Sequence, residues 1–314
     1  MSTRSPSKLE AYLDFSRPFT LLPPAIGMVS GSLTALGATT PDAGRWTNSW
    51  AHGPTMLAVH ILVGAVMASC LNAFSNGLNQ ICDLEIDRVN KPHRPLCDGR
   101  LSKREAWWLT GALLVVALAL AAIVGWQCLA LAGAASVFTT AYSSEPLRMK
   151  RRGVWANVSI AVPRGLLLKV CGWSVVKDVL TPEPWIIGSV FGLFLLGAST
   201  TKDFADMKGD RAGGCETLPV RYGLRKSAAM ISPFFVLPFA GLAVGAQVGW
   251  FTGNRAALTA LGVALALWGT WVARSMLRDP EALASTENHP AWTQMYVMML
   301  VLQVGFAAAY LVSV

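Results

Sequence analysis

The sequence predicts an all-α, polytopic membrane protein with nine transmembrane helices, and three observations lead to this fold class. Of the 314 residues, 53% are hydrophobic and only 14% are charged, whereas about a quarter of the residues of a soluble domain are charged. Nine apolar runs are close to the roughly 20 residues that a helix needs to cross a bilayer. Most lysines and arginines fall in alternate connections between these runs.

The nine predicted spans are joined by polar connections. The first begins at residue 18, after a mostly polar stretch, and contains Pro23 and Pro24. It lacks the short apolar core and small-residue cleavage site of a signal peptide. The fourth span is short, and only Gly125, Trp126 and Gln127 mark its border with the third. The spans are residues 18–37, 54–76, 106–125, 127–143, 154–174, 184–201, 228–249, 256–273 and 291–313.

The basic residues predict which side of the membrane each connection occupies. With the N-terminus in the cytoplasm, 21 of the 26 lysines and arginines lie on the inner side, including Arg4, and the outer loops keep only Arg45, Lys177 and Arg255. This excess is what the positive-inside rule describes. It predicts a C-terminus, at Val314, on the outer side. Because no Arg- and Ser-rich transit extension is present, we expect the cell (inner) membrane of a prokaryote.

The remaining composition argues against other classes of protein. The net charge of +8 follows from the predicted topology and adds some attraction to anionic lipid head groups. No soluble basic domain is present to bind nucleic acid, and no protein partner is indicated. The six cysteines form no CxxC pair and show no pairing with the four histidines, so neither a zinc site nor a disulfide framework is predicted.

The chain is interpreted as one membrane domain, residues 1–314, with an internal duplication. Span two leads into an acidic motif and a loop rich in Arg, Lys and Pro, and span six leads into a similar pair of segments. The predicted pseudo-repeats are residues 12–143 and 154–273, and the ninth helix, 291–313, follows them. Repeated bundles with a site at their interface are common among membrane proteins.

The first acidic motif follows directly on span two. Asn79, Asp83 and Asp87 are spaced four residues apart, so in a helix they form one oxygen-bearing stripe. Asn79 lies deeper in the membrane than the two acids, where a polar amide needs a partner. A structural interpretation is also open, in which Asp87 pairs with Arg88 or Lys91 on a solvated helix.

The second acidic motif follows span six on the same predicted side. Asp206 and Asp210 form a stripe of the same spacing, Asp203 lies one turn earlier, and Lys202 shares the Asp206 face. Carboxylates at the ends of membrane helices are costly unless a cation lies between them. Because Mg²⁺ commonly bridges a few carboxylates to substrate phosphates, the two motifs predict a Mg²⁺–diphosphate site at the membrane surface.

Basic residues should complement such a site, because a diphosphate leaving group gains negative charge as its bond to carbon breaks. Arg164 and Lys169 lie inside span five, where charges are rare and usually face a cavity. Being five residues apart they diverge, so we expect Arg164 to line the site and Lys169 to extend toward the membrane surface. The other candidates are Arg17, Lys91, Arg94 and the cluster Arg148, Lys150, Arg151 and Arg152, which the positive-inside rule explains equally well.

These motifs resemble the UbiA-type superfamily of intramembrane prenyltransferases. The resemblance rests on the NxxxDxxxD and DxxxD patterns and extends over residues 79–100, 142–157 and 202–223, with Arg17-Pro18 at the start. Residues 79–92 are similar to the homogentisate and tocopherol/plastoquinone branch. The second stretch also resembles chlorophyll synthases, and the third also resembles archaeal glycerol-phosphate prenyltransferases.

The resemblance implies a helical bundle around a central cavity, in which Asp83, Asp87, Asp206 and Asp210 bind Mg²⁺ and an isoprenyl diphosphate. The prenyl tail runs into the membrane, and ionisation gives an allylic cation that an acceptor attacks. At Lys202 some relatives carry an acidic or tyrosyl residue, and Asp203 is the candidate substitute. Together with the residues chosen on charge, the predicted substrate-binding residues are Arg17, Asn79, Lys91, Arg94, Tyr142, Arg148, Arg164, Lys202 and Asp203.

The sequence therefore predicts a Mg²⁺-dependent prenyltransferase acting on a lipid-soluble, aromatic acceptor in quinone or related prenyl-lipid synthesis. Its expected partners are the isoprenyl diphosphate, the acceptor and membrane lipids. The alternatives are a glycerol-phosphate ether-lipid prenyltransferase, a carotenoid elongase and a terpene cyclase. A cation transporter, from a different class, is disfavoured because transporter sites usually lie at the membrane midplane.

Overall fold

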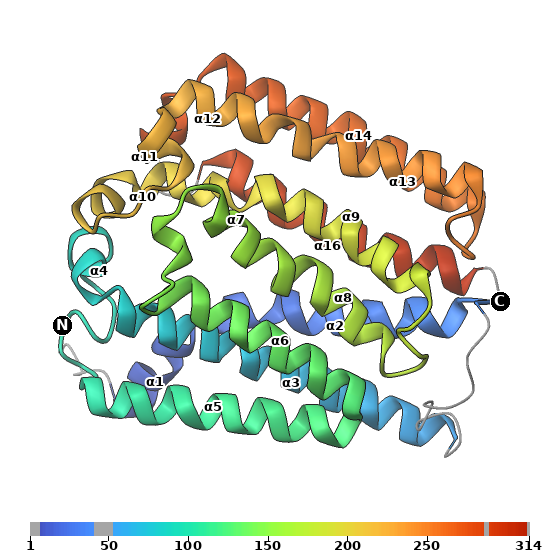
Figure 1. Ribbon diagram of the computed structural model, residues 1–314, viewed down its shortest axis with the longest axis horizontal. Coiled ribbons are helices and arrows are strands. Elements are labelled where there is room, and N and C mark those ends of the chain that lie inside the picture. The colour runs from blue at the N-terminus through green and yellow to red at the C-terminus, as the bar shows by residue number, and fades with distance from the viewer. Residues whose placement is uncertain (1–6, 41–52, 286–288, 313–314) are drawn as a thin grey trace, which may run out of the picture.

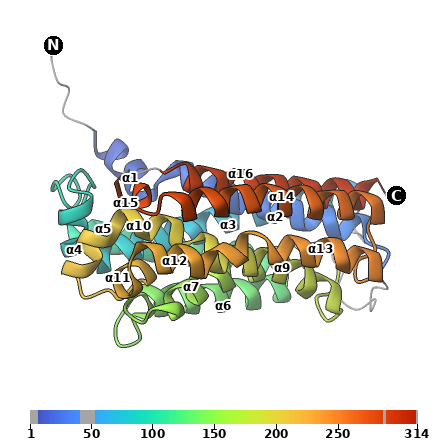
Figure 2. The ribbon, with the colours of Figure 1, turned by 90° about the horizontal axis from the view of Figure 1, so that it is seen from above.

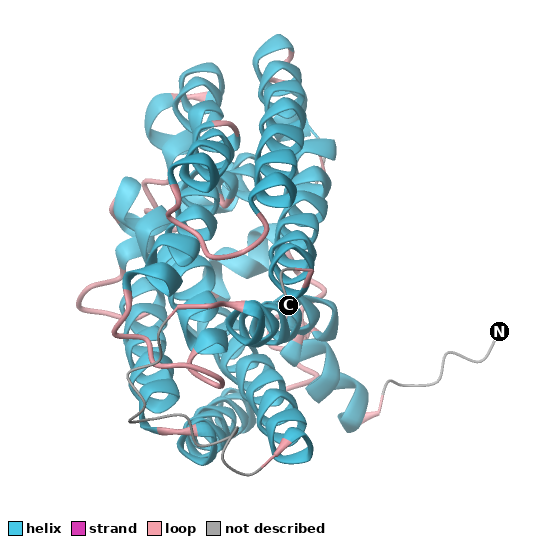
Figure 3. Cartoon of the chain, turned by 90° about the vertical axis from the view of Figure 1, so that its right-hand side faces the viewer, coloured by secondary structure: helices cyan, strands magenta, loops and turns pink. Residues whose placement is uncertain are grey.

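The computed structural model describes residues 7–40, 53–285 and 289–312. In this part of the chain the regular elements are all helices (Figure 3), which confirms the predicted all-α class. Arg4, Arg45 and Val314, on which the predicted topology partly depends, lie outside the described residues.

The helices follow the apolar runs of the sequence. Their bounds are α1 Lys8–Ser16, η1 Pro18–Leu21, α2 Leu22–Gly37, α3 Pro54–Cys82, α4 Leu84–Asn90, α5 Lys103–Val124, α6 Trp126–Ser143, η3 Met149–Arg151, α7 Val154–Ala161, η4 Val162–Leu167, α8 Leu168–Trp173, α9 Pro182–Ala198, α10 Thr200–Ala212, α11 Leu218–Tyr222, α12 Leu224–Ile231, η5 Ser232–Phe235, α13 Leu237–Val248, α14 Arg255–Arg278, α15 Ala282–Ser285 and α16 Pro290–Leu311.

Eight helices in the described residues are long and apolar enough to cross a membrane, so the predicted number of nine is not confirmed. The fourth predicted span is present as α6, which lies beside α5 and α3 in the bundle (Figure 1). It is not among the eight, since Gln127, Thr139, Thr140 and Tyr142 lower its hydropathy. The predicted border with the third span is confirmed, because Gly125, with φ 153°, separates α5 from α6.

Local sequence explains several helix ends. Ser102 and Glu105 form a capping box at the start of α5, in which each side chain accepts a backbone N–H that the helix leaves unpaired. Prolines occupy the first turn of α3, α9 and α16, where their missing N–H costs nothing.

Small residues allow the helices to pack closely. Gly31 of α2 lies against Gly172 of α8, and a Cβ atom at Gly31 would lie 2.8 Å from the Gly172 Cα. Such contacts between small residues are typical of membrane helix bundles. Lipid tails surround apolar side chains as favourably as the protein interior does, so the helices associate through close packing. In the most apolar 18-residue stretch of the α9–α10 segment 61% of the residues are buried, against 22% in that of α5, in keeping with their central and peripheral positions in Figure 1.

Both acidic motifs lie at one end of the bundle. α4 and α10 pack against each other there, although more than 100 residues separate them in the sequence (Figures 1 and 2). The last turn of α16 lies at the opposite end. The fold thus brings the two predicted halves of the site together.

Candidate active site

A cavity with a volume of about 290 Å³ extends from the junction of α4 and α10 into the bundle. It contains most of the predicted site. Twelve of the thirteen predicted residues line it, namely Arg17, Asn79, Asp83, Asp87, Lys91, Arg94, Tyr142, Arg164, Lys202, Asp203, Asp206 and Asp210.

The side chains of Asn79, Asp83 and Asp87 all line the cavity, as predicted, although the helix that carries them breaks at Asp83. α3 ends at Cys82, Asp83 adopts φ −105°, and α4 starts at the next residue. The Asn79 side-chain amide donates to Asp83 Oδ2 at 2.6 Å, which explains the polar group predicted deep on this helix. The Asp87 N–H donates to the Asp83 carbonyl at 2.8 Å. Both carboxylates are buried, at 3% and 4% exposure, and they reach the same cavity.

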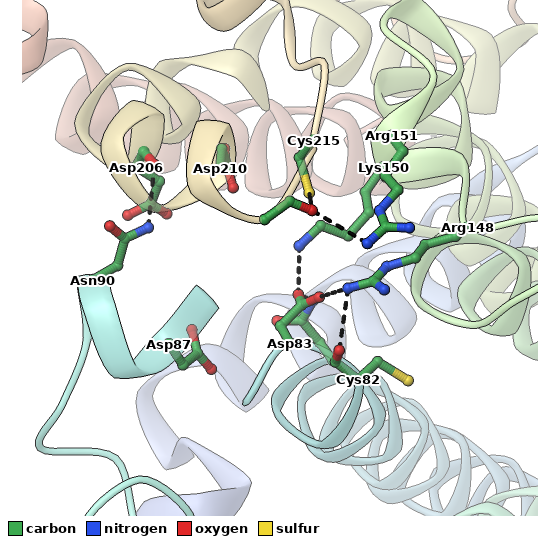
Figure 4. A network of polar contacts seen from close by, with 12 residues as sticks. Cys82, Asp83, Asp87, Asn90, Arg148, Lys150, Arg151, Asp206, Asp210 and Cys215 are labelled. Carbon is green, nitrogen blue, oxygen red and sulfur yellow. Dashed lines mark hydrogen bonds and ion pairs between the residues drawn. The ribbon is translucent and has the colours of Figure 1, made fainter. Parts of the chain in front are cut away.

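The second stripe faces the first across the cavity, as Figure 4 shows for Asp206 and Asp210 opposite Asp83 and Asp87. A residue that the sequence did not single out joins the two helices. The Asn90 side chain donates to the Asp206 carbonyl at 3.1 Å and accepts the Gly209 N–H at 3.0 Å. A Cβ atom at Gly209 would overlap the Asn90 side chain. Glycine at this position therefore permits the close approach of α10 to α4.

Three of the four predicted metal-binding carboxylates are paired with cations. Lys150 Nζ lies 2.6 Å from Asp83 Oδ2, and Lys91 Nζ lies 2.8 Å from Asp206 Oδ2. Arg94 forms an ion pair with Asp87. All six of these side chains line the cavity.

The alternative interpretation of the first motif as a solvated helix is wrong. Asp87 pairs with Arg94, not with a residue four positions away, and Arg88 instead pairs with Glu85 at 2.8 Å. Lys91 pairs with the second motif. Of these three basic residues, Lys91 connects the two acidic motifs, whereas Arg88 and Arg94 pair within the first.

The structure corrects the choice of Arg148 within the basic cluster. Arg148 contacts Asp83 at 3.3 Å and Glu145 at 3.4 Å but does not line the cavity. Lys150 lines it and is 5% exposed, whereas Arg151 and Arg152 are exposed. A run of four basic residues in five positions satisfies the positive-inside rule whichever of them faces inward, so no local signal distinguished Lys150.

Burial and charge shift the pKa values of groups at the mouth of the cavity. Burial raises the pKa of Asp87 more than the neighbouring Arg94 lowers it. For Lys150, burial opposes the charged form, but attraction to Asp83 and other acids outweighs it and the pKa rises. Burial lowers the pKa of Arg17, and the positive charges of Arg94 and Arg164 lower it further. Positive charge is therefore concentrated on the wall formed by these three arginines, which suits an anion.

The two charged residues of span five point in different directions, as predicted. Arg164 lines the cavity and donates to Ser75 Oγ at 3.2 Å. Lys169 does not extend to the membrane surface. Its Nζ donates to Ser30 Oγ at 2.7 Å and lies 4.9 Å from the centre of the Phe191 ring. It is 3% exposed and buried between helices, so the expectation for its side chain was wrong.

Part of the cavity wall, formed by the first half of α16, is aromatic and aliphatic. Trp292, Tyr296 and Met299 of α16 line it, and Lys202 Nζ lies 5.6 Å from the centre of the Trp292 ring. Tyr142 contributes from the end of α6. A ligand with one charged end and one apolar end would match this arrangement.

The acidic oxygens fit a hard cation that brings further ligands with it. In residues 7–40, 53–285 and 289–312 no group of three His, Cys, Asp or Glu side chains lies close enough to hold a metal ion. Mg²⁺ commonly binds through one or two carboxylates plus substrate phosphates and keeps several waters. Carboxylates from two facing helices, with no nitrogen or sulfur ligand among the predicted set, suit that mode.

Comparisons with known proteins identify the family. The UbiA prenyltransferase family matches residues 43–287. Homogentisate phytyltransferase from Synechocystis sp. is 29% identical over 274 residues, covering 84% of this chain and 78% of the relative. Digeranylgeranylglyceryl phosphate synthase from Methanopyrus kandleri is 30% identical over 271 residues, covering 84% and 91%.

Solved structures show the same fold. A UbiA homolog from Archaeoglobus fulgidus, solved bound to GPP and Mg²⁺, has a TM-score of 0.72 and 19% identity, covering 96% of this chain and 99% of the other. The family match extends over most of the chain, and the helices are those of an integral membrane protein. The chain belongs to the UbiA prenyltransferase family.

Proposed function

We propose that this prenyltransferase moves a polyprenyl group from an isoprenyl diphosphate to a lipid-soluble, aromatic acceptor, and that the reaction depends on Mg²⁺. One observation supports this most strongly: two carboxylate-bearing helices face each other across a cavity whose wall on α16 is aromatic and aliphatic. The relatives include a homogentisate phytyltransferase.

In this proposal Asp83, Asp87, Asp206 and Asp210 hold Mg²⁺. The bound metal would stabilise the negative charge of the diphosphate as a Lewis acid. Asn79 keeps the Asp83 carboxylate oriented through its 2.6 Å hydrogen bond.

The basic residues bind the diphosphate itself. Lys91, Arg94 and Lys150 pair with carboxylates and can transfer their hydrogen bonds to phosphate oxygens once these arrive. Arg17 and Arg164 line the cavity and make no ion pair within the described residues. All five can stabilise charge on the leaving group where it develops.

Bond cleavage and bond formation then follow in order. The bond between the allylic carbon and the diphosphate oxygen breaks, and its electron pair stays on the diphosphate. A ring carbon of the acceptor forms a bond to the allylic cation and subsequently loses its proton to the released diphosphate. The apolar wall around Trp292 and Met299 limits access of water, which would otherwise capture the cation.

A glycerol phosphate is the second candidate acceptor. It brings a second anion, and Arg17 and Arg164 offer positive charge beyond the three ion pairs. A relative named digeranylgeranylglyceryl phosphate synthase is as similar to this chain as the phytyltransferase.

The test is to incubate purified protein with radiolabelled geranylgeranyl diphosphate, Mg²⁺ and a panel of acceptors. We expect a prenylated phenolic acid or quinol. Prenylation of a glycerol phosphate alone would support the second candidate. A cyclised hydrocarbon formed without acceptor would indicate a cyclase, and elongation of a carotenoid would indicate an elongase.

We also propose that the site opens to the cytoplasm of a prokaryotic cell, because 21 of the 26 basic residues lie on that side of the predicted topology. Single cysteines placed at Lys208 and Arg255, in a background without native cysteines, should react differently with an impermeant maleimide in intact cells. We expect labelling at position 255 and protection at position 208. The opposite pattern would reverse the orientation.

A further inference from the structure

The chain changes direction at Arg17, beside the candidate active site. α1 ends at Ser16, Arg17 adopts a left-handed conformation with φ 57°, and the 3₁₀ turn η1 begins at Pro18. This backbone conformation costs a residue with a side chain roughly 1–2 kcal/mol, and it persists only where the surrounding structure stabilises it. Arg17 lines the cavity, so the break places a guanidinium where a diphosphate would bind.

Side chains on one face of α3 bind backbone carbonyls on both sides of this break. The last four carbonyls of a helix have no partner within it, and two of the bound carbonyls belong to the last turn of α1. The donors are spaced three or four residues apart, which keeps them on one face of the helix. The four pairs are Ser69 Oγ with the Leu21 carbonyl at 3.3 Å, Asn72 Nδ2 with that of Thr20 at 2.9 Å, Asn76 Nδ2 with that of Ser16 at 3.1 Å, and Gln80 Nε2 with that of Phe15 at 2.7 Å.

Asn76 fixes the two peptide groups that flank the Arg17 Cα atom. Its amide donates to the Ser16 carbonyl at 3.1 Å and to the Thr20 hydroxyl at 2.8 Å. The Thr20 hydroxyl in turn donates to the Arg17 carbonyl at 2.8 Å. Asn72 and Asn76 are 9% and 5% exposed, so water has little access to these bonds. The two asparagines therefore stabilise the backbone conformation that Arg17 needs.

The same helix leads directly into the first acidic motif. Asn79 follows Asn76 by three residues, and Asp83 follows Gln80 by three, so these side chains lie on neighbouring parts of one helix surface. Within the residues that the structure describes, Arg17 forms no ion pair. Its position relative to Asp83 therefore depends on the backbone contacts with α3 rather than on a carboxylate partner.

We propose that Asn72 and Asn76 are positioning residues, which fix the Arg17 backbone so that its guanidinium meets the diphosphate of the substrate. The proposal rests on the proposed function, in which Arg17 stabilises charge on the leaving group. Both asparagines also line the cavity, so the test must separate an effect through Arg17 from direct contact with the ligand.

The test is a double-mutant cycle on ligand binding. Asn76→Leu nearly preserves the size of the side chain and removes its donor, and it is made alone and together with Arg17→Met. Affinity for geranyl thiolodiphosphate, an uncleavable analogue, is measured by titration calorimetry with Mg²⁺, so no transfer is required. We expect Asn76→Leu to lower the affinity about tenfold in the wild type but less than about twofold beside Arg17→Met, because two changes in one network do not add. Asn72→Leu should behave in the same way.

Gln127→Leu is the matched control for loss of a buried amide. Gln127 is 6% exposed and donates to Asp178 Oδ1 at 3.0 Å, between α6 and the α8–α9 connection. Both Gln127→Leu and Asn76→Leu should lower the unfolding temperature. Only Asn76→Leu should lower the affinity for the analogue and speed hydrogen exchange in the backbone of residues 15–21.

The outcomes of the cycle also separate this proposal from the proposed function. If the expected coupling is found but no acceptor is prenylated, the proposed function is wrong and the positioning role is supported. An equal loss of affinity with and without Arg17 would show direct contact between Asn76 and the ligand. Unchanged affinity despite faster exchange would show a purely structural role. Either result would overturn the positioning role alone, whereas a wild type that does not bind the analogue would overturn both proposals.

Discussion

The two ends of the bundle both bury carboxylates, and they satisfy them in different ways. At the α4–α10 end, Asp83, Asp87 and Asp206 pair with lysine and arginine side chains around a cavity. At the opposite end, Glu183 of α9 is 5% exposed and accepts hydrogen bonds from neutral groups. Its donors are the Tyr310 hydroxyl at 2.5 Å, the Thr252 N–H at 2.7 Å and hydroxyl at 3.0 Å, and the Thr40 hydroxyl.

The carboxylates at the α4–α10 end form an exchangeable site, whose lysine and arginine partners can move to another anion. Glu183 has a fixed set of hydrogen-bond donors. The donors to Glu183 come from the segment after α2, the α13–α14 connection and α16, so this carboxylate ties together segments that are distant in the sequence. The flexible cations at the other end can turn from carboxylate to phosphate without moving a helix. Burial of an acid is therefore insufficient to identify a site. The nature of its donors and an adjoining cavity distinguish the two.

The largest effect should come from removing a carboxylate of the exchangeable end. Asp206→Asn nearly preserves the shape of the side chain but removes its charge. Because metal ions contribute several kcal/mol of transition-state stabilisation, we expect diphosphate release to slow more than 100-fold. Asp206 and Lys91 are both partly exposed to the cavity, so thermal unfolding in detergent should change little. Activity within about tenfold of wild type, roughly 1.4 kcal/mol, would exclude Asp206 from the metal site.

Glu183→Ala should have the opposite profile. It leaves several buried donors unpaired, at about 1–3 kcal/mol for each unsatisfied group, so we expect a loss of stability of about 3 kcal/mol. The rate per folded molecule at low temperature should stay near the wild-type value. The measurements are unfolding midpoint and initial rate on the same sample, and Glu281→Ala, at an exposed acid, is the control. A large loss of rate with normal stability would mean that this end also takes part in the reaction.

For the exchangeable end of the bundle, much of the site could be predicted from the sequence. Spacing of four residues aligned Asp83 with Asp87 and Asp206 with Asp210, because helix periodicity is a local property. The position of Arg164 in the cavity also followed from the rarity of charges within a span. These predictions needed only the chain segment that carries them.

Long-range packing was not predictable in the same way. Asn90 joins the motifs through residues more than 115 positions away, and no pattern near it indicates this. Lys150 could not be distinguished from Arg148, since the turn between α6 and η3 decides which one faces inward. The polar partners of Lys169 lie on α2, so its burial depends on how two distant helices pack.

Metal binding offers a smaller and more specific test of the exchangeable pairs. A divalent cation must displace Lys150 from Asp83 unless a diphosphate accepts the lysine. We therefore expect Lys150→Met to bind Mn²⁺ alone several-fold more tightly than the wild type, by about 1 kcal/mol, a typical size for couplings between binding sites. Its transfer rate should nevertheless fall. Electron paramagnetic resonance of free Mn²⁺ measures the affinity.

Lys226→Met is the matched control, because Lys226 lies beside the Tyr222 ring outside the cavity. Its affinity for Mn²⁺ should equal that of the wild type. Weaker Mn²⁺ binding by Lys150→Met than by this control would contradict the competition between lysine and metal at Asp83.

The smallest effect concerns the bridge between the two motifs. Asn90→Ala removes two hydrogen bonds to α10, each worth about 1 kcal/mol in net stability, but leaves every carboxylate and cation in place. We expect kcat/KM to fall about threefold to tenfold, with a higher Mg²⁺ concentration needed for half-maximal rate, because the two stripes are held less firmly at one separation. Gly209→Ala should act in the same direction, since its methyl group pushes Asn90 away from α10. In the double variant the two effects should not add, because both break the same contact. Full additivity would show that Asn90 and Gly209 act on the site independently.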